Sequence, residues 1–502
     1  MHTARLENRY LQAFPASGLR HCRAQTAPAP RLVLANQRLA GQLGIPADWI
    51  SGERGAALWT GNACPPGAVP IALAYAGHQF GVPVACLGDG RALLLGQLRD
   101  SAGRCYDLQL KGAGATPFSR GGDGLAALGP ALREYLVSEA MAALGIATSR
   151  ALAVALTGTP VKRQSGTEPG AVLTRVASSH LRFGSFEFHA HRGDIDGLRC
   201  LAEAAIDWHF PALREQPAPA RYRALLRGIA TRTAILVSEW LRVGFIHGVM
   251  NTDNMTVSGE TLDYGPCAFM DQFRPDRVYS SVDRDGRYAW NQQPRMAHWN
   301  LARLAECLLP LLDADDKAAV TQAETILAEF PTQFALAHNH MLARKLGLAR
   351  RNAEPSATAS VDGELGERLL ALMARYEVDF TNTWRLLMEA PPQDSQQIRR
   401  LQAWLGGDTA ARAWMADYAA RLEQLGIGER RRRRCMASAN PVVIPRNHRI
   451  ETALAAARAG DMAPARRLAG ALRSPYRPAH EFPELTRPPE PAEIVPATFC
   501  GT

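Results

Sequence analysis

The sequence predicts an α+β protein of two lobes, a small β-rich lobe with one main helix followed by a large helical lobe. Between residues 71 and 178, short runs of β-forming residues surround a single strong helical pattern. From about residue 197 to 430, apolar residues recur every three or four positions, as they do on the buried face of a helix. A chain of 502 residues with 47% hydrophobic content is long and apolar enough to bury more than one core.

The elements of the small lobe can be located from composition and flanking residues. Its one main helix is predicted over residues 130–146, because the apolar pattern begins after Gly129 and ends near Gly145. Its strands are predicted at four short segments, RALLLGQL, CYDLQLK, AVALTG and AVLTRVA.

The large lobe contains a series of helical patterns. Five segments repeat apolar residues at helical spacing: YRALLRGIATRTAILVSEWLRVG, AHWNLARLAECLLPLL, DDKAAVTQAETILAEF, GELGERLLALMARYEVDF and ARAWMADYAARLEQLG. These long patterns predict a lobe built almost entirely from helices.

Composition shifts divide the chain into four expected parts. The Pro- and Ala-rich N-terminal part has one amphipathic helix candidate at residues 31–45, and the last part has one helix at 449–460 before a Pro-rich tail with Cys500. The parts are residues 1–70, an extension expected to wrap the small lobe; 71–190, the small lobe; 191–430, the helical lobe; and 431–502, the C-terminal helix and tail.

Composition and cysteine spacing exclude several classes of protein. The longest apolar runs, such as residues 151–158, are far shorter than the roughly 20 residues that span a bilayer. The N-terminus lacks the apolar segment of a secretory signal, so we expect a cytoplasmic protein. The nine cysteines form no C-x-x-C pair, which argues against a zinc site and against a disulfide framework.

The positive charge of the chain does not by itself indicate nucleic-acid binding. The formal net charge is +9, and arginines form an unbroken run at residues 430–434. No helix-turn-helix, zinc-finger or RNP-type pattern accompanies this run, and isolated arginine clusters usually lie on a solvated helix face. We therefore do not expect a nucleic-acid partner, since ligands that carry phosphates explain scattered arginines equally well.

The segment HGVMNTDN at residues 247–254 has the outline of a kinase catalytic loop with one acid missing. Such loops read H-R-D-x-x-x-x-N, in which the Asp accepts the proton of the substrate hydroxyl. Asn254 stands at the expected distance from His247, but Val249 occupies the place of the Asp. Together with the order of the two lobes, this segment predicts a protein kinase-like bilobal fold whose catalytic carboxylate lies elsewhere.

Two further elements of a kinase-like site can be found in the small lobe. Lys111 ends a predicted strand and Glu134 lies in the one helix, the arrangement in which a glutamate holds a phosphate-binding lysine. A surface lysine and a surface glutamate are the alternative for each residue alone, but their order in the chain favours the pair.

Glycine-rich turns can place backbone N–H groups against phosphates. Gly88, Gly90 and Arg91 lie in one turn before a strand, and a longer Gly-rich run with Asp123 and Gly124 follows Lys111. Because Asp-Gly is also the commonest hairpin signal, the first turn alone is weak evidence.

Asn254 and Asp263 predict a divalent metal site. Asp263 begins the tripeptide DYG and is separated from Asn254 by the short hairpin-like segment MTVSGETL, as the DFG Asp follows the loop Asn in kinases. Carboxylate and amide oxygens are hard ligands that suit Mg²⁺ or Mn²⁺.

Seven segments together resemble the selenoprotein O family, also called YdiU-type proteins. They appear in the family's order and cover nearly the whole chain: AYAGHQFG, LQLKGAGATPFSRGGDG, LREYLVSEAMAALGI, TRVASSHLRFGSFEF, HGVMNTDNM, LDYGPCAFMD and NPVVIPRN.

The resemblance implies a pseudokinase fold that binds ATP in a reversed orientation, with the α-phosphate facing the acceptor. Members of the family transfer AMP, and in some cases UMP, to Ser, Thr or Tyr hydroxyls of proteins. The implied co-substrate is ATP or UTP, and the implied partners are acceptor proteins. In this pose the enzyme does not need a carboxylate at position 249, where this chain has a valine. The candidate catalytic base is then Asp253.

The resemblance also implies a role for each matching residue. Arg175 and Arg182 are similar to an arginine pair that grips the distal phosphates, a task that suits the planar guanidinium group. The other implied nucleotide contacts are Gly88, Gly90, Arg91, Lys111 with Glu134, Asp123, Gly124 and Asp263, and the implied metal ligands are Asn254 and Asp263.

The chain departs from the family pattern at three places. Leu125 stands where Arg usually follows GDG, and GPA at residues 129–131 replaces a typical Arg-Ser-Ser, which puts nucleotide affinity or preference in question. The cysteine that many members carry after the DYG segment is absent. Cys500 matches the position of the family's selenocysteine, and a regulatory disulfide between Cys267 and Cys500 is a hypothesis.

Two other classes of function fit part of this pattern. A nucleotide-binding scaffold without catalysis is the first alternative, although it would not need Lys111, Asn254 and Asp263 together. A true kinase is the second, and it would require a carboxylate near Val249. Transfer of the α-phosphate or the γ-phosphate distinguishes these classes.

Overall fold

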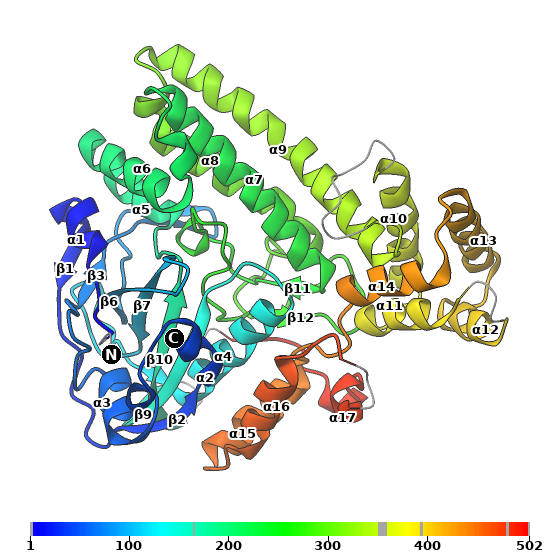
Figure 1. The fold of residues 1–502 in the computed structure, drawn as a ribbon, viewed down its shortest axis with the longest axis horizontal. Helices are drawn as coiled ribbons and strands as arrows, with labels where there is room; N and C mark the ends of the chain where they lie inside the picture. Colours follow the sequence, from blue (N-terminus) through cyan, green and yellow to red (C-terminus); the bar gives the residue numbers. More distant parts are fainter. Residues whose placement is uncertain (1–3, 164–165, 350–358, 392–394, 478–480, 500–502) are drawn as a thin grey trace.

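The computed structural model describes residues 4–163, 166–349, 359–391, 395–477 and 481–499. A β-sheet occupies the N-terminal part and helices build the remainder, as Figure 1 shows. This confirms the predicted mixture of a β-rich first part and a large helical second part.

Within the described residues, eight strands form one antiparallel sheet in the order β1-β3-β6-β7-β10-β9-β2, with β8 also paired to β10. The four strand segments predicted from composition lie in β6, β7, β9 and β10. The strands of the sheet are β1 (Leu19–His21), β2 (Arg31–Ala35), β3 (Ile71–Leu73), β6 (Ala92–Arg99), β7 (Cys105–Lys111), β8 (Ala126–Ala127), β9 (Arg150–Arg163) and β10 (Gly166–Ala177).

Part of the N-terminal extension forms strands of this sheet, which composition did not indicate. The helix candidate at residues 31–45 is wrong in part, because Arg31–Ala35 is the edge strand β2 and a helix starts only after Asn36. The Asn36 side chain accepts a hydrogen bond from the Leu39 N–H, which caps this helix. The helices before the sheet's central strands are α1 (Arg9–Ala13), α2 (Gln37–Gln42) and α3 (Gly52–Thr60).

The two faces of the sheet have different coverings. On one face, Leu132 and Leu136 of helix α4 (Leu128–Ala143) pack with Leu173 into a core that continues into the long helices. On the other face, Trp59 of α3 belongs to a second core with Leu110. The helix predicted at residues 130–146 is therefore confirmed as the element that joins the sheet to the helical part.

The helical part begins after β10 and its longest helices contact one another, as Figure 1 shows for α7, α8 and α9. All five helical patterns of the sequence lie in helices here. The helices are α5 (Phe183–Ala190), α6 (Ile195–His209), α7 (Ala220–Arg242), α8 (Gln293–Leu312), α9 (Asp316–Lys345), α10 (Ala359–Arg375), α11 (Phe380–Glu389), α12 (Ser395–Trp404), α13 (Thr409–Gln424) and α14 (Glu429–Ala439).

The C-terminal part contains more helices than the one predicted at 449–460. The described elements are α15 (Asn447–Arg458), α16 (Ala463–Leu472) and α17 (Pro483–Thr486). The arginine run lies in α14, where Arg432 is fully buried and donates hydrogen bonds to the carbonyls of Leu387 and Met388. Part of the run therefore serves packing.

Between α7 and α8 the chain forms short elements that face the sheet. They are β11 (Phe245–Ile246), the single turn η4 (Thr252–Asn254) and β12 (Ala268–Phe269), while a separate hairpin of β4 (Gly77–Gln79) and β5 (Val82–Val84) lies against η4. No helix of the described residues has the length and apolar character of a membrane span.

Candidate active site

A cavity of about 530 Å³ lies between the loops of the sheet and the loops around η4. It brings together residues that are far apart in the sequence. Of the predicted site residues, those that line it are Gly88, Gly90, Arg91, Lys111, Asp123, Gly124, Arg175, Arg182, Asp253, Asn254 and Asp263. Glu134 does not line this cavity but lies directly behind Lys111.

Lys111 lies at the end of β7, where its ammonium group bridges two carboxylates. Its Nζ is 2.7 Å from Oε2 of Glu134 on α4, and 3.1 Å from both carboxylate oxygens of Asp263. The lysine–glutamate pair predicted from sequence order is therefore formed, and it joins the sheet, α4 and the DYG segment.

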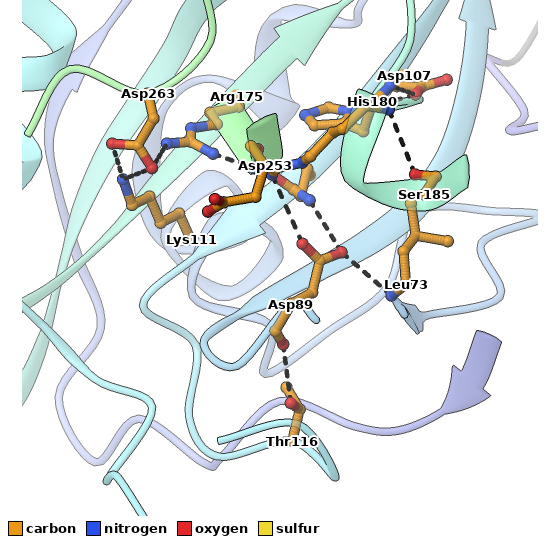
Figure 2. A network of polar contacts seen from close by, with 12 residues as sticks. Leu73, Asp89, Asp107, Lys111, Thr116, Arg175, His180, Ser185, Asp253 and Asp263 are labelled. Atoms are coloured by element: carbon orange, nitrogen blue, oxygen red, sulfur yellow. Dashed lines mark hydrogen bonds and ion pairs between the residues drawn. The ribbon is translucent and has the colours of Figure 1, made fainter. Parts of the chain in front are cut away.

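Arg175 completes this cluster from the neighbouring strand β10. Its Nε donates to Oε1 of Glu134, and its Nη2 lies 3.1 Å from Oδ2 of Asp263. The side chain is only 2% exposed. Arg175 is thus held among carboxylates, and Figure 2 shows its contact with Asp263 beside Lys111.

Asp263 is the negative centre of this cluster. Burial opposes its ionisation, but the charges of Lys111 and Arg175 outweigh burial and hold the pKa of Asp263 well below its usual value. The carboxylate therefore stays ionised. The backbone of Asp263 has a positive φ of 70°, a conformation that is strained for a residue with a side chain.

Arg182 approaches the cavity from the start of α5. Its Nη1 donates to the backbone carbonyl of Asp253 at 2.8 Å, and its guanidinium carbon lies 4.6 Å from the centroid of the Tyr75 ring. Its Nη2 is 3.7 Å from Oδ1 of Asp89. The two predicted arginines therefore line one cavity but have different partners.

Asp253, in η4, has an environment opposite to that of Asp263. It is 8% exposed, and its Oδ1 has no hydrogen-bond partner among the described residues. Burial raises its pKa to about 6, although the charge of Arg182 acts in the other direction. A carboxylate whose pKa is raised in this way can accept a proton near neutral pH.

Asn254 is oriented by the segment that replaces the usual catalytic acid. Its Nδ2 donates to the carbonyl of Val249 at 3.0 Å, so the amide oxygen is the atom left for another partner. His247 is buried, which lowers its pKa, and it accepts a weak bond of 3.4 Å from the Val249 N–H. These contacts brace the loop.

The two Gly-rich turns are bound to each other. A Cβ on Gly88 would lie 2.4 Å from the Phe118 ring, and one on Gly90 would lie 2.9 Å from the Phe118 carbonyl oxygen. Thr116 donates to the Asp89 carbonyl at 2.8 Å. Glycine is therefore needed at positions 88 and 90 for close packing of the turns, whether or not a phosphate approaches.

An arginine, Arg163, lies beside the second Gly-rich turn, although position 125 holds a leucine where the family usually has an arginine. Arg163, at the end of β9, donates to the two oxygens of Asp123 at 2.8 and 3.2 Å, and to the Leu125 carbonyl at 2.9 Å. This pairing lowers the pKa of Asp123. Arg163 also lines the cavity, so a positive charge is present where the sequence indicated that one is missing.

The comparisons with known proteins agree with this geometry. A family model described as "Protein adenylyltransferase SelO" matches residues 6–473. The chain belongs to this family.

Curated relatives of the SelO family match nearly the whole chain, and each of the following is named "Protein nucleotidyltransferase YdiU". The protein of Rhodopseudomonas palustris strain BisB5 is 48% identical over 484 residues, which cover 95% of this chain and 96% of the relative. A protein of Methylorubrum extorquens is 50% identical over 480 residues, 94% of each chain. The protein of Cereibacter sphaeroides strain ATCC 17025 is 50% identical over 481 residues, 95% of this chain and 96% of the relative.

These findings confirm the resemblance and the predicted class of enzyme, a nucleotidyltransferase of the SelO family. A SelO-family enzyme requires a nucleotide as substrate, and the residues at the cavity wall include the cations that suit its phosphates.

Sequence reasoning missed several residues that line the cavity. Asp89 lies between the two glycines Gly88 and Gly90 of the first turn, and Tyr75 lies within the segment AYAGHQFG. Asn251 was also missed; its Oδ1 accepts bonds from the Phe80 N–H and the Tyr288 hydroxyl at 3.0 and 2.7 Å. The spacing of Asn251 ahead of Asp253 and Asn254 was the available signal.

Cys267 and the C-terminal segment both lie near the DYG turn. Cys267 is fully buried and its pKa is raised by burial to about 12. Cys500 lies outside the described residues, so the hypothesis of a Cys267–Cys500 disulfide stays a prediction. Thr498 is described, and its hydroxyl donates to the Pro266 carbonyl at 2.5 Å.

Proposed function

We propose that this enzyme transfers AMP from ATP, or UMP from UTP, to Ser, Thr or Tyr hydroxyls of proteins. The proposal includes a kinase-like fold that holds the nucleotide in the reversed orientation. Two observations support the kinase-like arrangement: the Lys111–Glu134 pair at 2.7 Å, and the presence of Lys111, Asn254 and Asp263 in the lining of one cavity.

The position of the Asp253 carboxylate carries the proposal. Position 249, which holds an acid in kinases, is a valine, whereas Asp253 lines the cavity and has a pKa raised to about 6. Asp253 therefore offers a proton acceptor at a different place from that of a kinase. An acceptor hydroxyl bound there would face a different phosphate of the nucleotide.

The reaction that we propose balances in one displacement. The acceptor oxygen attacks the α-phosphorus, the bond from that phosphorus to the oxygen bridging to the β-phosphate breaks, and pyrophosphate leaves. The hydroxyl proton passes to the Asp253 carboxylate, whose backbone is held by Arg182. Arg182 and Lys111 are the cations that we assign to the phosphates, together with Arg91, while Arg175 holds Asp263 and Glu134 in place.

We assign the backbone of the two Gly-rich turns to nucleotide contact. The residues of these turns that line the cavity and that we assign to the nucleotide are Gly88 and Gly90 in the first turn, and Asp123 and Gly124 in the second. Arg163 fixes the second turn through Asp123, which supports a preformed contact.

The donor set of Asn254 and Asp263 fits Mg²⁺ or Mn²⁺. An ionised carboxylate and an amide oxygen are hard ligands, and Mg²⁺ commonly takes one or two protein oxygens together with substrate phosphates. The strongly lowered pKa of Asp263 keeps that carboxylate available as a ligand. When bound, the ion would neutralise charge on the phosphates.

Three coarser proposals accompany this function. We propose the boundaries 1–70, 71–190, 191–430 and 431–502 for the parts of the chain, acceptor proteins as the macromolecular partners, and the cytoplasm as the location. The cysteine spacing, which lacks the pattern of a disulfide framework, supports the last of these.

Labelled ATP tests the proposal directly. The purified protein is incubated with Mg²⁺ or Mn²⁺ and ATP labelled on either the α- or the γ-phosphate, beside the variant Asp263→Ala. Label that enters protein from the α-phosphate alone and is lost in the variant supports nucleotidyl transfer at this site. Label from the γ-phosphate alone would establish a kinase, and ATP binding without label would favour the scaffold.

A further inference from the structure

Asp89 is a buried carboxylate at the edge of the cavity, outside the set of residues assigned above. It is 2% exposed, and its two oxygens have different partners. Oδ2 accepts hydrogen bonds from the Leu73 N–H at 3.1 Å and from Nε2 of Gln109 at 3.3 Å. Oδ1 faces Nη2 of Arg182 at 3.7 Å.

The backbone of Asp89 is fixed as firmly as its side chain. Its N–H donates to the Leu73 carbonyl at 2.8 Å, and its carbonyl accepts from the Thr116 hydroxyl at 2.8 Å. Figure 2 shows the contacts of Asp89 with Leu73 and Thr116. Asp89 thus joins strand β3, both Gly-rich turns and Arg182.

Gln109 extends this network to the second arginine. It is fully buried in β7, directly opposite Arg175 in the sheet register. Its Nε2 donates to Asp89, and its Oε1 accepts from Nη1 of Arg175 at 3.5 Å. One amide therefore lies between Arg175 and the carboxylate that faces Arg182.

Arg182 has fewer carboxylate contacts at the cavity wall than Arg175. Arg175 pairs with two acids, whereas Arg182 has one carbonyl bond, the Tyr75 ring and the carboxylate of Asp89. Its orientation depends on these three contacts, because a guanidinium group must keep its plane and fork aligned to bind a phosphate.

We propose that Asp89 is a positioning residue that orients Arg182 toward the distal phosphates of the nucleotide. The inference rests on the proposed function, since it takes Arg182 as a phosphate ligand. Asp89 would act through Arg182 and through no direct contact with the substrate.

The variant Asp89→Asn separates this role from general support of the fold. Asparagine keeps one oxygen, which the Leu73 and Gln109 donors require, so its NH₂ group is turned toward Arg182. Two donors then face each other, and Arg182 moves while the other contacts persist. We expect about 10-fold weaker ATP binding, equivalent to the loss of one charge-assisted contact.

Comparison of ATP with AMP gives the decisive readout. Dissociation constants for both nucleotides are measured with Mg²⁺ by calorimetry. AMP lacks the distal phosphates, so Asp89→Asn should change its affinity by less than about 2-fold. Equal loss for ATP and AMP would overturn the proposal, because it would show a purely structural role.

Two further variants keep the test independent of folding and of the proposed function. Arg182→Gln should produce the same selective loss of ATP, and the double variant should bind no more weakly than Arg182→Gln alone. An additive loss contradicts the proposal. If Arg182→Gln itself shows no preference for ATP, the assigned role of Arg182 fails; if it does and Asp89→Asn does not, only the present inference fails.

A matched control and a milder variant complete the experiment. Asp379 is another buried aspartate that pairs with an arginine, Arg446, at 2.8 Å, away from the cavity. Asp379→Asn should lower stability without changing the ratio of ATP to AMP affinity. Should Asp89→Asn not fold, Gln109→Met removes the amide link at similar size, and we expect a smaller loss, about 3-fold, again selective for ATP.

Discussion

The turn around Asp253 and the turn around Asp263 place two aspartates in one cavity with opposite electrostatics. Asp263 is surrounded by Lys111 and Arg175, which hold its pKa well below the usual value. Asp253 is buried, and its pKa is raised to about 6. The difference shows that neighbouring groups, rather than residue type, decide whether an aspartate in this cavity has a lowered or a raised pKa.

Asp263→Asn should give the largest effect, because it removes the charge of the aspartate that pairs with Lys111 and Arg175. The amide cannot balance Lys111 and Arg175 or serve as a charged metal ligand, so we expect transfer of α-label to fall at least roughly 1000-fold. Initial rates are measured with Mg²⁺ and with Mn²⁺. Activity within about 10-fold of the wild type would exclude Asp263 from the metal site.

Asp253→Asn should lower transfer by about 1000-fold while ATP binding changes little, because general bases commonly contribute roughly 100- to 10,000-fold. The rate of α-label transfer and the dissociation constant for ATP are measured on the same preparation. A similar loss in both quantities would argue for a binding role. Asp48→Asn, at an exposed ion pair with Arg54, is the control and should leave both unchanged.

The stability of the metal-free protein should sharpen the comparison, because the two aspartates have opposite signs. The pKa of Asp253 is above its reference of 3.8, so its ionisation disfavours the folded state as pH rises from about 4 through about 6. A pKa raised to about 6 corresponds to about 3 kcal/mol once ionisation is complete. Asp253→Asn should therefore stabilise the protein by about 1–3 kcal/mol at pH 8 and have little effect near pH 4.

Thermal unfolding in EDTA without nucleotide measures this change. Asp263→Asn should act in the opposite direction at pH 8, since removing one member of a buried ionic cluster leaves its partners uncompensated. Destabilisation of both variants at pH 8 would show that the two environments do not differ as described.

Thr498→Val should give the smallest effect on transfer. It removes the hydroxyl bond to the Pro266 carbonyl but keeps the two backbone bonds of residue 498, so we expect a loss of about 1 kcal/mol in stability and a few-fold change in rate. Thr486→Val removes a comparable but exposed bond, to the Pro483 carbonyl, and is the control. Equal effects of the two variants would show that Thr498 gives the DYG segment no special support.

Local patterns predicted the elements and residues whose signals are themselves local. The α4 helix, the central strands and the spacing of His247, Asn254 and Asp263 are all defined within short segments; the helix and strands are confirmed, and the three residues line one cavity. The edge strand β2 was missed because Arg31–Ala35 continues into a helical pattern, and only pairing with β9 decides its conformation.

The partners of the site residues could not be predicted in the same way. Arg163 replaces the charge missing at Leu125, yet it lies 40 positions after Asp123, and only the return of β9 over the second turn brings it there. The contacts of Asp89 with Gln109 and Arg182 likewise depend on the order of strands in the sheet. A single sequence does not show which distant segments pair, so these contacts could not be predicted from it.

The contact between Thr498 and the segment after Asp263 has a consequence for synthesis of the chain. Thr498 is bonded through its hydroxyl to Pro266 and through its backbone to Tyr279 and Ser281, more than 200 positions earlier. While a ribosome is still translating the helices in between, these bonds cannot form. The contacts of the C-terminal segment with the residues after the DYG turn are therefore among the last to form, after the sheet and residues 247–254 have left the exit tunnel.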